Sequence, residues 1–579
     1  MVTSRKKQAL RTGESHIQAV RERYPGVVLS ESWSTDYQPV ITVARDSAPV
    51  VIEYLYYQRG GWMPVMIGND ERSFNNCFAL YYILSMEEED RCMLTVRVEV
   101  PADTCEFYAV SPKVPAAVWS EREVQDMFGL HAIGIIDNRN LVLPDDWPMD
   151  IHPLRKDAMD YRYRPAPTRD IENYEFLKDT GDHETTTIPM GPMHITSDEP
   201  GHFRLYVEGE EIIDADYRMF FVHRGMEKCA EARMDYDNVS FLAERICGIC
   251  GYAHSVAYSE TVERAQGIEV PLRAQYIRAI LLETERLHSH LLNLGLVCHY
   301  SGFDTGFQHF FRIREKSMDL AELLTGARKT YGYNLIGGVR RDILAEQKLE
   351  TLRLIGELRA DAKRLVDELL STPNFLKRAQ GVGKLDPKIA RDYSPVGPCV
   401  RGSGFARDVR WVHPFDGYAA IAAKHKPITA DTCDVFGRTV VRVGEFLDSI
   451  DIIEELLSAD LPSGIVLNDK FNIDPHKFAL GWTEAPRGED VHWSMIGNDQ
   501  KCYRWRAKAS TYSNWPVLRY MFRGNTISDA ALIVGSIDPC YSCTERVSII
   551  DVKKGTEKVV TKQQLETYAR TRKHSPLAD

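Results

Sequence analysis

The sequence has no hydrophobic run that could cross a membrane, which takes roughly 18 uninterrupted apolar residues. Its start, Met1–Lys7, is not followed by the apolar core of a signal peptide. Basic residues are in the minority, with 71 basic against 83 acidic side chains and a net charge of −12. This negative charge repels phosphate backbones and anionic lipid. We therefore expect a cytoplasmic protein that has no nucleic-acid partner.

Cysteines are few and mostly isolated, which argues against the dense disulfide framework of a small secreted fold. There is also no closely spaced run of cysteines of the ferredoxin kind, so we expect no iron-sulfur cluster in this chain. If the protein moves electrons, their onward carrier lies in another subunit. Eight of the twelve cysteines stand alone and are expected to be reduced, mostly buried thiols: Cys77, Cys92, Cys105, Cys229, Cys298, Cys399, Cys433 and Cys502.

The other four cysteines form two Cys-x-x-Cys pairs, Cys247 with Cys250 and Cys540 with Cys543. Thiolates are soft ligands that select zinc, nickel, copper(I) or iron, so the two pairs together predict a four-sulfur metal site. Zinc modules usually bring their pairs together within roughly 15 to 20 residues, whereas here 290 residues separate Cys250 from Cys540. Long loops close at a cost that grows only logarithmically, so a structural zinc site and a redox or catalytic metal both remain open from spacing alone.

Periodicity along the chain predicts an α+β protein with two domains. The first, residues 1–165, is a mixed α/β domain, and the second, residues 188–546, is mainly α-helical with a helix-bundle core. Residues 166–187 form a polar linker, and residues 547–579 form a C-terminal extension. We expect strands at 40–43, 63–67 and 93–100, and helices at 48–57, 119–130, 342–370, 438–458 and from Pro271 onward.

Three segments of the first domain carry a resemblance to a known family. Trp119–Leu130, Leu141–Trp147 and His152–Asp157 follow one another as in the signature of the 30-kilodalton subunit of respiratory complex I. In that family the domain serves docking and assembly and holds no cofactor. The resemblance therefore implies that the chemistry lies in the second domain.

The second domain resembles the large subunit of nickel-iron hydrogenases, in the membrane-bound branch related to the 49-kilodalton subunit of complex I. Besides the two cysteine pairs, the motifs in the family's order are Gly191–His194 leading to Glu199 and Pro200, His223–Lys228, Arg401–Gly404 and Glu484–Gly488. Complex I itself lacks the cysteine pairs, so four retained thiols favour a metal centre over a quinone pocket. The fused first domain makes the chain most similar to the formate hydrogenlyase type.

The resemblance assigns roles to the four cysteines. Cys247 and Cys540 would bind nickel terminally, and Cys250 and Cys543 would bridge nickel to an iron that carries CO and CN ligands supplied by maturation proteins. The reaction implied is the reversible reduction of protons to H2. Its chemistry needs a metal, a nearby base and polarizable thiolates.

Other residues of the family's site also match. The proline and glycine of Glu484–Gly488 predict a rigid turn that aims the Arg487 side chain inward. By resemblance Arg487 would overhang the open metal position, where a fixed positive charge can act, and Glu199 would carry protons. His254, four residues after Cys250, is a candidate hydrogen-bond donor to a bridging sulfur. Pro486 and Asp538 would lie around the ligands.

Two positions leave open whether the site binds a third metal, magnesium or iron. Arg546 stands where most hydrogenase large subunits have a histidine that helps to bind it. Glu227 could contribute to such a site or to a proton path, although its Arg-Gly-Met-Glu turn could equally be structural. The isolated histidines His288, His290 and His299 are expected to pack in the core or between helices.

The resemblance also implies partners and processing. They are a small subunit with an iron-sulfur cluster, a ferredoxin-like electron-transfer subunit, formate dehydrogenase, membrane-arm subunits related to complex I, and a peptidase that cuts after Arg546. The chain would then lie on the cytoplasmic face of the inner membrane, held there by its partners. The alternative is a non-catalytic, zinc-clipped electron-transport scaffold related to complex I.

Overall fold

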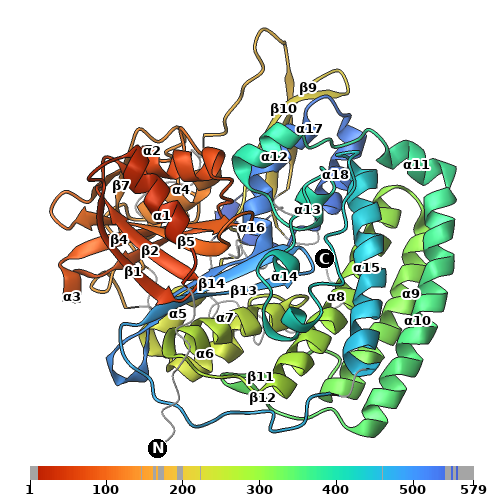
Figure 1. Cartoon of the computed structure of the whole chain (residues 1–579). Coiled ribbons are helices and arrows are strands. Elements are labelled where there is room, and N and C mark those ends of the chain that lie inside the picture. Colours follow the sequence, from red (N-terminus) through yellow and green to blue (C-terminus); the bar gives the residue numbers. More distant parts are fainter. Residues whose placement is uncertain are drawn as a thin grey trace, which may run out of the picture.

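The computed structural model describes residues 11–144, 147–160, 165–166, 175–191, 200–221, 223–458, 461–541, 549–551 and 556–558. In Figure 1 a sheet domain built from the N-terminal part of the chain lies at the left and four long helices lie at the right. Strands β13 (Phe478–Ala485) and β14 (Gly488–Ile496) lie between them. The fold is α+β, as the sequence predicts. None of the helices in the described ranges is both long and apolar enough to span a membrane.

The N-terminal domain is built on a five-stranded sheet with strand order β1-β2-β5-β4-β3. Its strands are β1 (Val28–Thr35), β2 (Gln38–Val43), β3 (Met66–Asp70), β4 (Cys77–Met86) and β5 (Cys92–Pro101). Only β2 and β5 run parallel, and the other neighbours are antiparallel. Every residue of β4 is buried, because helices cover one face of this sheet and the second domain covers the other. The strand predicted at 63–67 begins three residues later than expected.

Helices α1 (Glu14–Arg23), α2 (Ala48–Glu53) and α4 (Val118–Phe128) belong to the same domain. The predicted helix at 119–130 is thus confirmed as α4, and it ends at the glycine that the sequence indicated. Gly129 takes a left-handed backbone with φ 63°, and its N–H bonds back to the Gln125 carbonyl. The helix predicted at 48–57 forms as α2, followed by a wider π-helical turn at Tyr54–Gln58.

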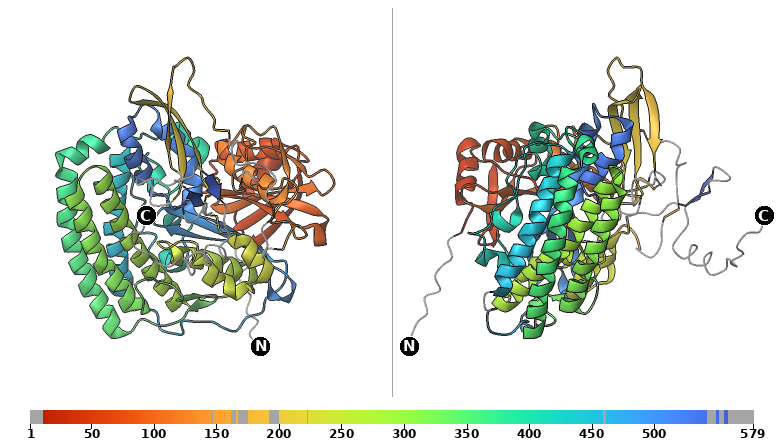
Figure 2. Two further views of the ribbon diagram at one scale, coloured as in Figure 1. Left: turned by 180° about the vertical axis from the view of Figure 1, so that it is seen from behind. Right: turned by 90° about the vertical axis from the view of Figure 1, so that its right-hand side faces the viewer.

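Four long helices form the bundle of the second domain: α8 (Leu272–Tyr300), α9 (Asp304–Thr325), α10 (Ala345–Ser371) and α15 (Val435–Ser458). Helix α8 packs against both α9 and α15, and α10 also contacts both of these helices. The right-hand view of Figure 2 shows the long helices running side by side. Most of α8 is buried on all sides, as expected of a helix surrounded by neighbours. Pro373 ends α10 as predicted, and it also opens the short helix α11 (Pro373–Ala379).

A three-stranded antiparallel sheet joins the bundle to the N-terminal domain. It consists of β13 (Phe478–Ala485), β14 (Gly488–Ile496) and β15 (Cys502–Lys508), and every residue of β14 is buried. Helix α7 (Gly251–Gln266) packs on β13 and β14 from one side. The sequence predicts the turn between β13 and β14 but not the sheet to which these strands belong.

The two domains share buried polar contacts as well as apolar ones. The Gln38 amide bonds in both directions with the Leu480 backbone, each time at 3.0 Å, so that β2 and β13 are tied together. Arg504 Nε donates to the Gly68 carbonyl at 2.9 Å. One apolar cluster contains side chains of both domains, among them Ile67 and Trp493. The N-terminal sheet domain and the rest of the chain therefore pack tightly on each other, and the division at 165 and 188 stays a prediction.

The remaining elements are short. The helices are α3 (Arg72–Asn75), α5 (Met226–Arg233), α6 (Tyr236–Ala243), α12 (Pro387–Tyr393), α13 (Pro398–Arg401), α14 (Val409–Val412), α16 (Ser510–Asn514), α17 (Leu518–Phe522) and α18 (Ala530–Ser536). The strands are β6 (Glu106–Tyr108), β7 (His131–Ile133), β8 (Thr186–Met190), β9 (His202–Glu208), β10 (Glu211–Arg218), β11 (Asn334–Leu335), β12 (Gly338–Val339), β16 (Ile549–Asp551) and β17 (Thr556–Lys558).

Candidate metal centre

Three of the four paired cysteines meet in the interior. Cys247 follows α6, Cys250 is the residue before the first turn of α7, and Cys540 follows α18. Their sulfur atoms all lie within 4.8 Å of one another, and the Sγ atoms of Cys247 and Cys540 are 3.2 Å apart. That distance is well beyond the roughly 2.0 Å of a disulfide bond, so the thiols converge without being joined. The fourth predicted ligand, Cys543, lies outside the described residues.

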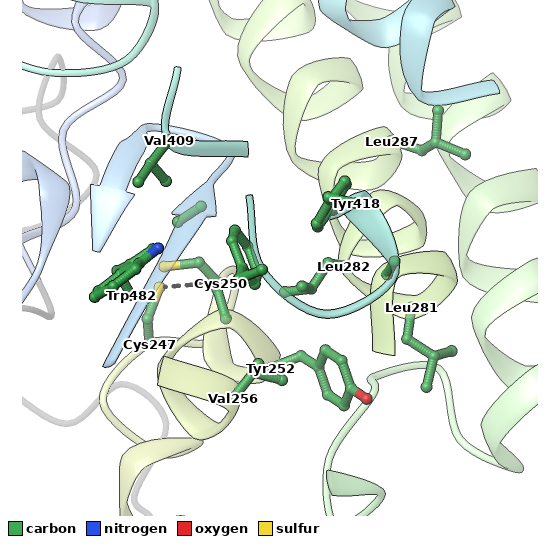
Figure 3. Packing of buried hydrophobic residues seen from close by; sticks show 14 of the residues in the cluster. Cys247, Cys250, Tyr252, Val256, Leu281, Leu282, Leu287, Val409, Tyr418 and Trp482 are labelled. Carbon is green, nitrogen blue, oxygen red and sulfur yellow. Dashed lines mark hydrogen bonds between the residues drawn. The ribbon is translucent and has the colours of Figure 1, made fainter. Parts of the chain in front are cut away.

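Backbone groups support this convergence. The N–H groups of Ile249 and Cys250 donate to Cys247 Sγ at 3.2 and 3.4 Å. Such bonds stabilise negative charge on sulfur and tune a bound metal. Figure 3 shows Cys247 and Cys250 next to each other among buried hydrophobic residues of the same cluster. The three cysteines are 2 to 4% exposed, so the site is closed to bulk solvent.

Helix α7 is fixed at its start by a residue that the sequence analysis missed. Glu285, on the buried face of α8, accepts the N–H groups of Tyr252 and Ala253 at 2.8 and 3.0 Å. These two amides belong to the first turn of α7 and have no partner within the helix. Burial raises the pKa of Glu285 to about 7, although the two N–H bonds work against it. A glutamate in the middle of a buried helical pattern was the available signal.

Arg487 lies in the turn between β13 and β14, close enough to the three cysteines to interact with them electrostatically. Its Nε donates to the Asp538 carbonyl at 2.7 Å and its Nη2 to Asp538 Oδ1 at 3.0 Å. The side chain is 3% exposed, and its Nη1 has no hydrogen-bond partner among the described residues. Burial would lower the pKa of Arg487, but Asp538 and the three cysteines raise it well above the ordinary value. The guanidinium is therefore a fixed positive charge beside the thiols.

The backbone around Arg487 is tightly constrained. Pro486 and Arg487 are the only two residues of the hairpin turn, because Ala485 pairs with Gly488. Gly397 lies so close that a Cβ added to it would meet the Arg487 carbonyl oxygen at 2.1 Å. Asp538 has a left-handed backbone with φ 54°, a conformation that few residues other than glycine adopt. The predicted rigid turn at Pro486 is thus confirmed, and Asp538 holds the guanidinium at the cysteines.

His254 lies one helical turn after Cys250 and is 1% exposed. Its Nδ1 is 2.7 Å from Asp490 Oδ2 and 3.1 Å from His492 Nε2. Both partners are on β14, and the sequence analysis named neither of them. Burial would lower the pKa of His254, but the Asp490 carboxylate outweighs burial and the pKa is raised.

Glu227 is held between two arginines on β15. Its Oε2 accepts from Arg504 Nη1 at 2.7 Å and its Oε1 from Arg506 Nη1 at 3.0 Å. Burial would raise the pKa of Glu227, but the two guanidinium groups lower it to about 2. Both carboxylate oxygens are therefore already paired with protein cations. A metal-ligand or proton-path role for Glu227 stays a prediction.

The other predicted residues fall into two groups. Glu199 and Arg546 lie outside the described residues. Of the three histidines expected to pack, His288 and His290 are buried, with Nε2 3.1 Å from the Ile249 carbonyl and 3.0 Å from Glu445. His299 is instead exposed at the end of α8, with Nδ1 2.7 Å from the exposed Asp304. The eight single cysteines are all unbridged, and five of them are buried.

The donor set fits a soft-metal centre. Three buried sulfurs converge, and Arg487 Nη1 and Asp538 Oδ2 are buried without a partner among the described residues. Unpaired buried polar atoms are costly, so their presence at one place indicates a group that completes them. A nickel-iron centre held by Cys247, Cys250 and Cys540 has the ligand chemistry that these residues offer.

Comparisons with known proteins agree with this geometry. Family models match as "Respiratory-chain NADH dehydrogenase, 30 Kd subunit" at residues 41–163, "Nickel-dependent hydrogenase" at 224–298, and "Respiratory-chain NADH dehydrogenase, 49 Kd subunit" at 301–480 and 471–546. The first match covers most of the N-terminal sheet domain, and the second contains Cys247 and Cys250.

Similar proteins match over nearly the full length. Formate hydrogenlyase subunit 5 of Escherichia coli (strain K12) is 58% identical, covering 98% of this chain and 99% of that protein. Hydrogenase-4 component G of the same organism is 57% identical, covering 98% of each. Among solved structures, a chain of the membrane-bound sulfane sulfur reductase, an archaeal respiratory membrane complex, matches with a TM-score of 0.59 and 30% identity, over 63% of this chain and 99% of that one. The chain therefore belongs to the family of membrane-bound, nickel-dependent hydrogenase subunits related to the 49- and 30-kilodalton subunits of NADH dehydrogenase.

Proposed function

We propose that this chain is the catalytic large subunit of a membrane-associated nickel-iron hydrogenase that reversibly reduces protons to H2 in a formate hydrogenlyase-type complex. The observation that carries the proposal is the convergence of Cys247, Cys250 and Cys540 beside the buried guanidinium of Arg487. Cys543 is proposed as the fourth ligand. The CO and CN ligands on iron belong to the same proposal.

Individual residues of this chain would have distinct roles in the reaction. When bound, the nickel-iron centre supplies the redox chemistry of H2 formation and cleavage. Arg487 keeps a positive charge at the open side of the site, and Asp538 fixes its orientation through two bonds. The apolar shell around the cysteines excludes water, which strengthens this electrostatic effect. Glu199 is proposed to pick up and pass protons.

Metal analysis tests the function directly. Purified complex containing this chain should hold nickel and iron, with infrared bands from CO and CN, and should evolve H2 from a reduced dye. A zinc-clipped scaffold related to complex I would instead hold stoichiometric zinc alone and show no such bands. That result would overturn the proposal.

The proton-carrying role of Glu199 has its own test. Glu199→Gln keeps the shape of the side chain but removes the exchangeable carboxyl proton. Nickel and iron should still load, while H2 evolution and hydrogen/deuterium exchange should both collapse. Near-normal turnover would remove Glu199 from the mechanism.

The proposed partners follow from the same assignment. Because this chain is expected to hold no iron-sulfur cluster, electrons would arrive through a small subunit with a cluster and a ferredoxin-like subunit, with formate dehydrogenase as their source. Membrane-arm subunits related to complex I would hold the chain at the cytoplasmic face of the inner membrane. The domain at 1–165 would serve docking, with 166–187 as linker and 188–546 as the catalytic domain.

We also propose that residues 547–579 are removed during maturation. Nickel must reach Cys540 and Cys543 before the site closes, and an uncut tail would keep their segment away from Cys247 and Cys250. A peptidase would then cut after Arg546. Intact-mass measurement of active enzyme checks this: a subunit that still carries Val547 to Asp579 contradicts it, and one that ends at Arg546 only after growth with nickel supports it.

A further inference from the structure

The hairpin that carries Arg487 has two acidic residues opposite each other at its base. Glu484 on β13 pairs with Glu489 on β14, next to the closing pair of Ala485 and Gly488. Both glutamate side chains are buried, with exposures of 2% and 0%. Negative charges directly opposite each other on neighbouring strands destabilise a hairpin, and burial increases the cost. The base of the hairpin therefore needs cations beside it to keep its shape.

One segment, residues 397–407, supplies these cations. Arg401 Nη1 donates to Glu484 Oε1 at 2.8 Å, and Arg407 Nη2 donates to Glu489 Oε1 at 2.9 Å. Burial raises the pKa of Glu484 to about 7, and Arg401 is the main group that opposes this rise. Arg401 Nη1 also donates to the Arg407 carbonyl at 2.8 Å, which joins the two arginines. Each strand of the hairpin is thus held by an arginine of the same segment.

The 397–407 segment also contacts the turn of the hairpin. A Cβ added to Gly488 would meet the Gly397 nitrogen at 2.5 Å, so the two backbones touch. Helix α13 begins at the residue after Gly397 and ends at Arg401. Because backbones packed this closely leave no room to slide, the 397–407 segment and the turn must move together.

The N-terminal domain contacts this segment through Glu87, the residue directly after β4. Glu87 Oε1 accepts from Arg407 Nε at 2.6 Å and from the Ser85 hydroxyl at 2.8 Å. Ser85 Oγ lies 2.9 Å from His413 Nε2, so a further contact between the domains supports this one. Arg407 is 5% exposed, and two nitrogens of its planar guanidinium join Glu87 to Glu489. A single side chain therefore connects the N-terminal domain to the base of the hairpin.

We propose that Glu87 is a positioning residue of the N-terminal domain that fixes Arg487 at the cysteines, acting through Arg407 and Glu489. This inference rests on the proposed function, since it concerns the same site. Glu489 is two residues after Arg487, so a displacement of β14 at Glu489 changes where the turn presents the guanidinium. The N-terminal domain then contributes to the chemistry as well as to docking.

The test removes the link in the intact complex. Glu87→Ala should leave the nickel content unchanged, shift the infrared CO and CN bands and reduce turnover about 10-fold, a loss typical of residues that orient groups at a metal. The loss should be smaller than that of Arg487→Lys, because the bonds from Arg487 to Asp538 remain. Glu88→Ala is the matched control, since Glu88 is the adjacent acidic residue and is exposed. Unshifted bands in Glu87→Ala, or an equal shift in Glu88→Ala, would overturn the proposal.

Glu87→Asp is a milder variant, because it keeps the charge and shortens the side chain by one methylene group. Its bands should shift in the same direction as those of Glu87→Ala, by a smaller amount. If Glu87→Ala does not load nickel, unshifted bands in a loaded Glu87→Asp variant would refute the positioning role.

A double substitution separates positioning from simple stabilisation of the domain interface. If Glu87 acts through Arg487, Glu87→Ala should change turnover less than about twofold in the Arg487→Lys background. A further 10-fold loss in that background would show that Glu87 acts independently of Arg487, and it would overturn the proposal. Wild-type complex without nickel or CO and CN bands would instead refute the proposed function itself.

Discussion

Two of the buried clusters of charged and polar groups differ in how completely they are paired. The cysteine cluster consists of Cys247, Cys250 and Cys540 with Arg487 and Asp538, and it leaves Arg487 Nη1 and Asp538 Oδ2 without a partner among the described residues. The ion cluster joins the two domains and consists of Glu123, Glu227, Glu231, Arg504 and Arg506. Within the described chain, all buried side-chain nitrogen and oxygen atoms of the ion cluster have partners.

This difference distinguishes a cluster that can bind a ligand from one that only stabilises the fold. In the ion cluster, Arg506 binds both oxygens of Glu123 at 2.8 Å, and Tyr512 adds a third bond at 2.7 Å. A fully paired buried cluster stabilises one arrangement of the domains and has no capacity left for a ligand. The cysteine cluster has such capacity. Substitutions in the first should therefore change stability, and those in the second should change chemistry.

The largest effect is expected for Cys540→Ser. A hydroxyl is a harder ligand than a thiolate, so the nickel-iron centre should not assemble and H2 evolution should fall below detection. Nickel content by mass spectrometry and H2 evolution by gas chromatography measure both. Cys399→Ser is the control, since Cys399 is a buried single thiol on α13. Equal losses in the two variants would show that the cysteine cluster is not the metal site.

Arg487→Lys should have the next largest effect. Lysine keeps the charge but cannot reproduce the planar pair of bonds to Asp538. We expect nickel and iron to load normally and turnover to fall about 10²- to 10³-fold, the loss typical of a fixed electrostatic donor. The thermal unfolding midpoint should change little. A variant with normal turnover per nickel would remove Arg487 from the mechanism.

The sequence predicted the cysteine cluster well, because its residues lie in short motifs. The two Cys-x-x-Cys pairs and the Pro-Arg-Gly turn are local patterns whose geometry follows from a few residues. The long helices were predicted for a similar reason, since the apolar face of α10 repeats at helical spacing over many turns. Local patterns of this kind can be recognised in the sequence without knowing which elements pack around them in the fold.

The residues that support the site were not predicted, because they come from elements that meet only in the folded chain. Glu285 is on α8 and Asp490 on β14, far in sequence from the amides and the histidine that they hold. Strand β14 could not be recognised from the sequence, because both of its faces are buried and it carries charged residues where a strand usually has apolar ones. Without alternation, neither a strand nor a site could be identified there.

Glu227→Gln should affect stability rather than turnover, because it belongs to the paired cluster. Removing the charge leaves Arg504 and Arg506 partly uncompensated in the interior. We expect a loss of about 3 kcal/mol of unfolding free energy. Thermal unfolding should show this as a lower midpoint, while H2 evolution per nickel stays at the wild-type level. A selective loss of activity without destabilisation would instead support a proton-path role.

The pH dependence of stability follows from the same residue. The pKa of Glu227 is lowered to about 2 from an ordinary value of 4.5, so its contribution is complete above pH 4.5 and is lost as the pH falls toward 2. Wild-type protein should therefore lose stability across this window more steeply than Glu227→Gln. Parallel curves for the two proteins would contradict the pairing with Arg504 and Arg506.

The smallest effect is expected for Pro486→Ala, next to Arg487 in the hairpin turn. Proline cannot take a positive φ, so the mirror-image turns common in two-residue hairpins are excluded here. The positive φ of this hairpin is instead at Gly488, with φ 124°. Alanine can adopt the same conformation but leaves the unfolded chain freer, so the cost should be about 0.4–1 kcal/mol. Turnover should fall less than in Arg487→Lys, because Asp538 still holds the guanidinium through its two bonds. Thermal unfolding and H2 evolution measured on one preparation would check this. A loss of turnover as large as that of Arg487→Lys would mean that the turn, rather than Asp538, determines the position of the Arg487 guanidinium.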